Sequence, residues 1–226
     1  MADKKFSTSS NTYTLVYAAI MVVIVAFLLS FVSSALRERQ DVNVKLDTKK
    51  QILASLNMTN LADADKQFSE SVKDMILEGD TLVDYTGTFA TIYESEGKAG
   101  RYHVFVCNVN GQTKYVIPVY GAGLWGAIWG YIALNDDKNT IFGTYFSHAS
   151  ETPGLGAEIA TPAFQARFAG KHIGDSTNVK ISVVKNGKVT NAEYEVDGIS
   201  GGTITSTGVD AMLKSCFSNY KNFLTK

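Results

Sequence analysis

The sequence predicts an α+β protein: one N-terminal transmembrane helix, then a domain that mixes helices with antiparallel hairpins. Three observations predict it. Residues 6–36 carry no charge, hairpin signals recur after residue 100, and the last segment repeats apolar residues at helical spacing. The expected organisation is a tail over 1–12, a transmembrane helix over 13–36, a helical lead-in over 37–98 and the α+β domain over 99–226.

The transmembrane prediction depends on an almost unbroken apolar run over residues 15–32. As a helix this run is long enough to cross a hydrocarbon core of ~30 Å. The alternative is a signal peptide, with Lys4 and Lys5 as its basic start and residues 33–35 as a cleavage site. We favour the anchor, because the run exceeds the apolar core of about 7–15 residues that signal peptides carry.

The basic residues that flank this run do not settle its orientation. Two lysines precede it and more basic residues follow, so the positive-inside rule does not support an exported C-terminal domain. The residues compared are Lys4 and Lys5 on one side and Arg37, Arg39, Lys45, Lys49 and Lys50 on the other.

The lead-in is polar, with a few apolar clusters. Ile52, Leu53 and Leu56 form the first. A second helix is predicted where apolar residues repeat at near-helical spacing, and we expect both helices to pack on the domain. The second set is Leu61, Ala64, Phe68, Val72, Met75 and Ile76.

Runs typical of strands dominate from residue 100, and turn residues separate them into hairpins. Asn-Gly between two such runs is a strong two-residue hairpin signal, and it occurs twice. The three expected pairs are 103–109 with 112–119, 128–134 with 140–146, and 180–184 with 188–196.

Two helices are predicted beyond the first four strands. Thr161-Pro162 is an N-cap followed by proline at the first position, with Phe164 and Phe168 pointing inward. The last helix is amphipathic. Its apolar face comprises Val209, Met212, Leu213, Cys216, Phe217, Tyr220, Phe223 and Leu224.

Composition excludes several functions. A net charge of −1 gives no sign of nucleic-acid binding. The two cysteines, Cys107 and Cys216, are far apart and fall on expected core positions, which argues against a metal or iron–sulfur site. The three histidines are scattered, so no metal site is expected, and no NADH fingerprint or Walker loop is visible.

One turn stands out, running from Asp197 to Ser206 as Asp-Gly-Ile-Ser-Gly-Gly-Thr-Ile-Thr-Ser. Thr203 lies just before the last helix, where unpaired N–H groups and the helix dipole stabilise an anion such as a phosphate. Gly201 and Gly202 let the backbone approach that anion closely. The alternative is ordinary helix capping, which uses the same residue types.

Two further stretches are candidates for binding. Residues 120–131 combine glycines with large aromatic rings, which suits close approach to a flat group; a strand entry with core tryptophans is the alternative. Residues 147–156 form a loop that Pro153 and glycines should order, and His148 and Glu151 are a candidate acid–base pair within it.

Together these strings resemble the FMN-binding domain family, which is shared by flavin-carrying subunits of the sodium-translocating NADH:quinone reductase and of the Rnf complex. The turn resembles the family's flavinylation motif Ser/Thr-Gly-Ala-Thr, with Gly202 in place of the usual alanine. The resemblance implies that Thr203 carries FMN through a phosphoester, and that a flavin transferase reads Asp197. The other implied flavin contacts are Ser200, Gly201, Gly202, Thr205, Trp125, Glu151, Thr152, Leu155 and Gly156.

Residues 123–126 and 130–134 are more similar to the quinone-reductase branch than to the Rnf branch. The resemblance then implies an electron carrier, without catalytic residues of its own, in a complex that couples electron transfer from NADH to ubiquinone to sodium export. It also implies an FMN-binding domain over 99–226 on the periplasmic or external side of the inner membrane, with the other subunits as partners. The alternatives are a subunit of the Rnf type and a membrane-tethered binding module without redox function.

Overall fold

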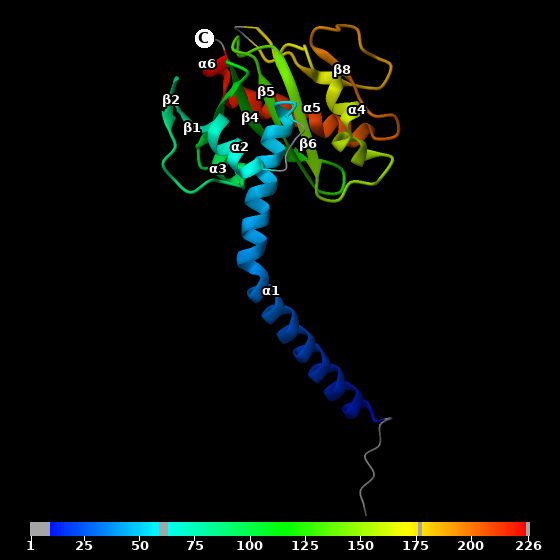
Figure 1. Cartoon of the computed structure of the whole chain (residues 1–226). Coiled ribbons are helices and arrows are strands. Elements are labelled where there is room, and N and C mark those ends of the chain that lie inside the picture. Colours follow the sequence, from blue (N-terminus) through cyan, green and yellow to red (C-terminus); the bar gives the residue numbers. More distant parts are fainter. Residues whose placement is uncertain (1–9, 59–62, 176–177, 225–226) are drawn as a thin grey trace, which may run out of the picture. The chain divides into compact units, whose positions relative to one another are not determined.

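A computed structural model describes residues 10–58, 63–175 and 178–224. The chain divides into two compact units, Met1–Val44 and Lys45–Lys226 (Figure 1). We describe each by itself. Leu61, Lys4 and Lys5 lie outside the described residues.

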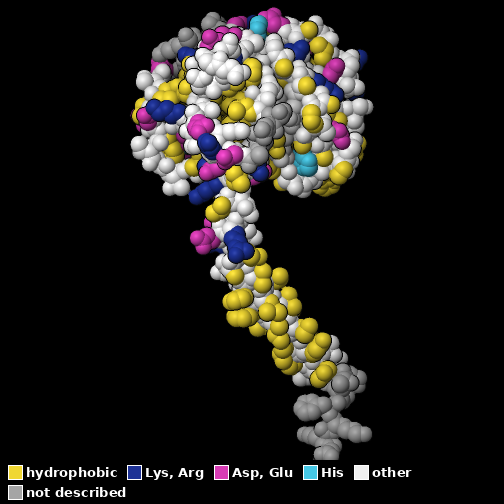
Figure 2. Space-filling view, viewed as in Figure 1, with side chains coloured by type: hydrophobic (Ala, Val, Ile, Leu, Met, Phe, Trp, Pro, Cys, Tyr) yellow, Lys and Arg dark blue, Asp and Glu magenta, His cyan; other side chains and the backbone are white. Residues whose placement is uncertain are grey.

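The first unit consists of the greater part of helix α1, Asn11–Ser55. Apolar side chains cover its surface (Figure 2), and those of Leu15, Phe27 and Leu29 are each more than 65% exposed. Within the described ranges, α1 is the one helix long and apolar enough to cross a membrane. The predicted apolar helix is therefore confirmed, although it continues without a break well past residue 36.

The second unit is built on a six-stranded antiparallel sheet of order β2-β1-β3-β4-β5-β6. β3 to β6 form a meander, and the β1–β2 hairpin adds to the free edge of β3. The strands are β1 Val72–Glu78, β2 Thr81–Asp84, β3 Tyr102–Val109, β4 Gln112–Ala122, β5 Ala127–Leu134 and β6 Ile141–His148.

Both faces of this sheet are covered, because successive side chains of a strand point to opposite faces. Val104 belongs to one hydrophobic core and its neighbour Phe105 to the other. Ile117 and Val116 divide in the same way, and all four side chains are fully buried. The sheet is thus the middle layer of a three-layer domain.

Different helices cover the two faces. On one face lie the end of α1 with α2 (Ala64–Ser71) and α3 (Tyr93–Lys98). Ile52, Leu53 and Leu56 are buried there, as the sequence predicts. The other face is covered by η1 Gly156–Ala160, α4 Pro162–Gln165, η2 Ala166–Phe168, α5 Thr203–Asn219 and α6 Lys221–Leu224, and by the strand pair β7 Ser182–Val184 and β8 Glu195–Asp197.

The predicted short helix α4 and the last helix α5 are confirmed. Thr161 caps α4 by accepting a hydrogen bond from the N–H of Phe164, and Phe164 and Phe168 are buried. The apolar face of α5 is buried from Val209 to Phe217.

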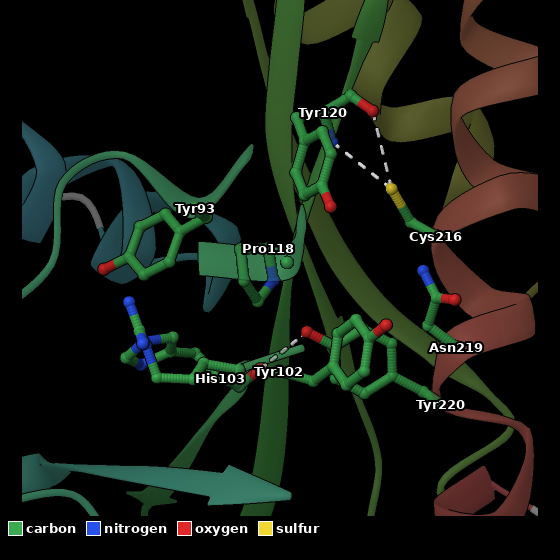
Figure 3. Close-up of a pocket in the computed structure, with 10 residues that line it drawn as sticks. Tyr93, Tyr102, His103, Pro118, Tyr120, Cys216, Asn219 and Tyr220 are labelled. Carbon is green, nitrogen blue, oxygen red and sulfur yellow. Dashed lines mark hydrogen bonds between the residues drawn. The ribbon is translucent and has the colours of Figure 1, made fainter. Parts of the chain in front are cut away.

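Close contacts hold α5 to the sheet (Figure 3). The Cys216 thiol donates to the carbonyl of Tyr120 and accepts from its N–H, both at 3.5 Å. The Tyr220 hydroxyl donates to the carbonyl of His103 at 2.9 Å. Cys216 and Cys107 are both buried free thiols, as predicted.

The first Asn-Gly hairpin is confirmed. Asn110 and Gly111 have φ angles of 52° and 82°, the positive pair that a type I′ turn requires. That turn matches the twist of paired strands, and Val109 pairs with Gln112 across it. The hairpin between β5 and β6 also forms as expected.

The second Asn-Gly prediction is wrong. β7 and β8 pair in parallel, and residues 188–194 form no strand. Gly187 has a φ of 74° but Asn186 has a negative φ, which is a type II arrangement. Such a turn does not match the twist of a hairpin, so the chain leaves β7 and returns alongside it.

The helical prediction for the lead-in is wrong over residues 72–84. The predicted helix ends at Ser71, and β1 and β2 follow as strands of the main sheet. Val72 to Leu77 pair with β3, from Cys107 back to Tyr102. Tertiary pairing with an open strand edge outweighs the helical spacing of the apolar residues.

Candidate functional site

Three stretches that are far apart in sequence meet at one end of the sheet. They are the loop between β4 and β5, the loop after β6, and the turn that leads into α5. Glu151 joins them: one carboxylate oxygen accepts the backbone N–H of Trp125 at 2.8 Å, and the other accepts the Thr205 hydroxyl at 2.6 Å. The structure therefore brings together the three motifs that the sequence singles out.

Glycines allow this close packing. A Cβ on Gly123 would lie 2.5 Å from Oε1 of Glu151, and one on Gly156 would lie 2.3 Å from Oε2. A Cβ on Gly126 would lie 2.5 Å from the hydroxyl of Ser150, which donates to the carbonyl of Trp125. Larger residues at these positions would push the loops apart.

The Glu151 carboxyl is 4% exposed and nevertheless has a lowered pKa. Burial by itself raises this pKa. The Thr205 hydroxyl and the backbone N–H groups of residues 124–126 outweigh burial, because they donate hydrogen bonds to the ionised form. The carboxylate is therefore charged at neutral pH.

His148 and Glu151 do not form the acid–base pair that the sequence suggests. Nδ1 of His148 accepts the backbone N–H of Glu151 at 3.2 Å, so it contacts the main chain of that residue. Within the described ranges no group of three or more His, Cys, Asp or Glu side chains could hold a metal ion.

The turn before α5 is held by Ser206. Its hydroxyl accepts the N–H of Ile199 and donates to the carbonyl of Gly202, both at 2.9 Å. Gly201 has a φ of 79°, a conformation that glycine adopts without strain. Gly202 is the N-cap, so Thr203 is the first residue of α5 and lies one position further into the helix than expected.

The hydroxyls around this turn differ in exposure. Thr203 is exposed on the first turn of α5. Thr205 and Ser206 are 1% and 4% exposed and already hydrogen-bonded. Thr207 is exposed, and its hydroxyl donates to the carbonyl of Thr203 at 3.0 Å. Ser200 is also exposed. Of the hydroxyls on the first turn of α5, that of Thr203 is the most open to reaction.

A hollow of about 60 Å³ lies beside Thr203. Lys185, Asn186 and Thr207 contribute to its lining. The sequence patterns did not single out Lys185 or Asn186, because they placed both residues at the tip of a hairpin. The parallel pairing of β7 and β8 instead brings this turn beside α5.

Exposed apolar side chains occur on all three stretches. Trp125 is 66% exposed, Ile204 59% and Leu155 42%. A Cβ on Gly201 would lie 2.7 Å from Leu155, so that side chain covers the turn before α5. Trp129, by contrast, is partly buried and donates from its ring N–H to Gln51 of α1 at 3.1 Å. Trp125 is thus the tryptophan that is free to contact a ligand, and Trp129 belongs to the core.

Asp197 and Thr152 mainly order the backbone. The Asp197 carboxylate accepts the N–H of Gly187 at 2.7 Å, and its carbonyl accepts from Arg167 at 2.9 Å. The carbonyl of Thr152 accepts the N–H groups of Leu155 and Ala157, both at 3.1 Å, while the residue itself is exposed.

These features fit a flavin mononucleotide. Exposed apolar side chains suit its flat ring, and the N–H groups at the start of α5 suit its phosphate. Glu151, however, is turned away from solvent and fully engaged with Trp125 and Thr205, so its side chain supports the site from beneath.

Comparison with known proteins agrees with this assignment. Residues 123–218 match the FMN-binding domain family model. The NqrC protein of the Na(+)-translocating NADH-quinone reductase of Haemophilus ducreyi is 28% identical, over 94% of this chain and 92% of its own. The crystal structure of the corresponding protein from Parabacteroides distasonis is 44% identical and superposes with a TM-score of 0.77, covering 84% of this chain and 98% of that chain. Shewanella oneidensis NqrC shares the fold, with 24% identity and a TM-score of 0.66.

The predicted quinone-reductase branch is thereby confirmed over the Rnf branch. The similarity extends across the full domain and includes the site that Glu151 assembles. The chain belongs to the NqrC family of the Na(+)-translocating NADH-quinone reductase.

Proposed function

We propose that this chain is the electron-carrying NqrC component of a Na(+)-translocating NADH-quinone reductase and carries FMN on Thr203 through a phosphoester. The observation that carries the proposal is the exposed Thr203 hydroxyl on the first turn of α5, between two loops with exposed apolar side chains. The match to the FMN-binding domain family supports FMN as the cofactor.

Thr203 is favoured over its neighbours by accessibility. Attachment at Thr205 or Ser206 would require a buried hydroxyl to leave its present hydrogen bonds. A phosphate on Thr203 would lie near the open N–H groups of α5 and gain ~0.3–1 kcal/mol from the helix dipole. Lys185, exposed on the adjoining hollow, adds a positive charge on the same side.

A separate flavin transferase makes the bond. A threonine hydroxyl is a weak nucleophile unless a base activates it. Among the described residues, no side chain accepts a hydrogen bond from the Thr203 hydroxyl. Asp197 is partly exposed at the start of the turn, which is compatible with recognition by the transferase.

Bound FMN supplies the electron-transfer chemistry, and the protein supplies orientation and environment. Trp125 and Leu155 offer apolar surface that limits the access of water to the ring. Ser200, Gly201 and Gly202 give the backbone the close approach that the phosphate end requires. No side chain of this chain needs to transfer a proton for the flavin to accept or donate electrons.

The apolar part of α1 anchors the chain in the inner membrane, and residues 99–226 form the FMN-binding domain on the external side. The basic residues that argue against export include Lys49, which pairs with Asp65 at 2.5 Å and lies 5.4 Å from the centre of the Phe68 ring. This lysine is part of the folded domain, so its weight in the positive-inside count is small. The other subunits would receive and deliver electrons and couple their transfer to sodium export.

The test is mass spectrometry of the full chain produced together with its transferase. We expect intact mass to show one FMN increment and peptide analysis to place it on Thr203. Thr203→Ala should remove the increment and leave the fold unchanged, since an exposed hydroxyl is lost. Thr207→Ala is the matched control and should retain the flavin. An increment on Thr205, or a Thr203→Ala chain that still fluoresces on a denaturing gel, would refute the assignment.

A further inference from the structure

We propose that Glu151 is a positioning residue that also tunes the flavin: it ties the tryptophan loop to α5 and keeps a negative charge beneath the flavin site that lowers the reduction potential. This inference rests on the proposed function, because it needs FMN at Thr203.

The positioning role follows from the contacts of the carboxylate. It accepts hydrogen bonds from the N–H of Trp125 and the hydroxyl of Thr205, which are 26 and 54 residues away in sequence. Gly123 and Gly156 pack against its two oxygens so closely that neither could carry a Cβ without displacement. The exposed ring of Trp125 and the exposed hydroxyl of Thr203 are therefore placed relative to each other through one side chain.

The charge of this carboxylate is not neutralised by a cation. Among the described residues, no Lys, Arg or His forms an ion pair with Glu151, and its partners are N–H groups and a hydroxyl. These donors favour the ionised form, so the group keeps its charge although it is 4% exposed. A flavin over Trp125 and Leu155 would cover the carboxylate further and reduce the screening of its charge by water.

A fixed negative charge disfavours reduction of a nearby flavin. Each electron that the flavin accepts from its donor in the complex adds negative charge to the ring, and a neighbouring carboxylate raises the free energy of that product. The midpoint potential is therefore lower with Glu151 than with a neutral residue in its place. This effect differs from that of Trp125, which contacts the ring without a charge.

The experiment uses the flavinylated full chain and the Glu151→Gln variant. Glutamine can keep both contacts, since its carbonyl accepts from Trp125 and its amide donates to the Thr205 oxygen. Glu158→Gln is the matched control: it removes the same charge from the 3₁₀ helix that follows, where Glu158 is partly exposed. Intact mass measures loading, and spectroelectrochemical titration measures the midpoint potential of the bound flavin.

We expect Glu151→Gln to be loaded and its midpoint potential to shift to more positive values, by more than in Glu158→Gln. Equal shifts in the two variants, or none in Glu151→Gln, would overturn the tuning role. If Glu151→Gln fails to load, Glu151→Asp and Thr205→Val decide, because both keep the charge and both should retain the wild-type potential. A positive shift in either overturns the proposal. Absence of FMN from the wild-type chain would refute the proposed function itself, which the mass measurement shows separately.

Discussion

Replacing Thr205 by valine should destabilise the domain even without flavin. Valine has nearly the same shape as threonine, so the substitution removes one hydroxyl and leaves no cavity. The lost hydrogen bond is 2.6 Å long and joins a hydroxyl of a residue that is 1% exposed to a carboxylate of one that is 4% exposed. Hydrogen bonds to charged groups contribute about 1.5–3 kcal/mol, so we expect unfolding to become easier by that amount.

The assay is urea and thermal unfolding of the chain without flavin, followed by circular dichroism. For a domain of this size, 1 kcal/mol corresponds to about 2–4 °C in Tm, which predicts a decrease of about 3–12 °C. Thr207→Val is the control, because it removes an exposed hydroxyl from the same helix turn and should cost less than about 0.5 kcal/mol. Equal effects of the two substitutions would contradict the structural role of the Glu151–Thr205 contact.

The effect should also depend on pH. The pKa of Glu151 is lowered from 4.5, so the stability that its ionised form contributes is present above pH 4.5 and is lost as pH falls through the folded-state value. The difference between wild type and Thr205→Val should therefore be largest at neutral pH. In acid it should approach the about 0.5–1.5 kcal/mol of a neutral hydrogen bond. A difference that grows on acidification would show that the carboxyl is protonated in the native state.

Three further predictions concern other parts of the chain. Removal of residues 1–36 should give a folded domain that stays soluble without detergent, as gel filtration and circular dichroism would show, and aggregation in every such buffer would contradict the expected partition. Trp125→Ala should keep the covalent flavin but change its fluorescence or potential, whereas unchanged spectra and potential would place Trp125 outside the flavin contact. Burial raises the pKa of the Cys107 thiol to about 12 and also raises that of Cys216, so iodoacetamide at pH 8 should modify both only after denaturation, as mass spectrometry would detect.

The two Asn-Gly turns show where local sequence determines structure and where it does not. At Asn110-Gly111 the flanking strands cross the middle of a sheet, and both residues adopt the positive φ angles that their type allows. At Asn186-Gly187 the same dipeptide forms a different turn, because Gly187 donates to Asp197 and the strands pair in parallel. The partner that decides is ten residues away, beyond the reach of a turn rule.

The helix predicted through Ile76 failed for a similar reason. The spacing of Phe68, Val72 and Ile76 fits a helix, but Val72 and Ile76 also lie on one face of a strand. The open edge of β3 selects the strand, and Asp74 then accepts a hydrogen bond from the buried His103 ring at 2.8 Å. A pattern that suits both periods is resolved only by the partner strand.

The candidate site was predicted more completely than the fold around it, because its residues lie in contiguous motifs. The sequence indicated which stretches meet, but it could not show that Thr203 is exposed while Thr205 is buried, since that depends on how α5 packs. It also suggested that Glu151 touches the flavin, whereas the contacts of its carboxylate place it as a support. Lys185 could not be identified before the parallel pairing was known.

The separation of 54 residues between Glu151 and Thr205 bears on the order of events in the maturation of this protein. Strands β3 to β6 pair with neighbours along the chain, and contacts of this local kind form early in folding. The site closes only when α5 docks against a sheet that already exists, so Thr203 becomes presented late. A transferase that recognises the assembled turn would therefore modify finished molecules and leave nascent or misfolded ones without flavin. Covalent colour would then report correct folding, and the fraction of coloured chains would measure how many molecules completed it.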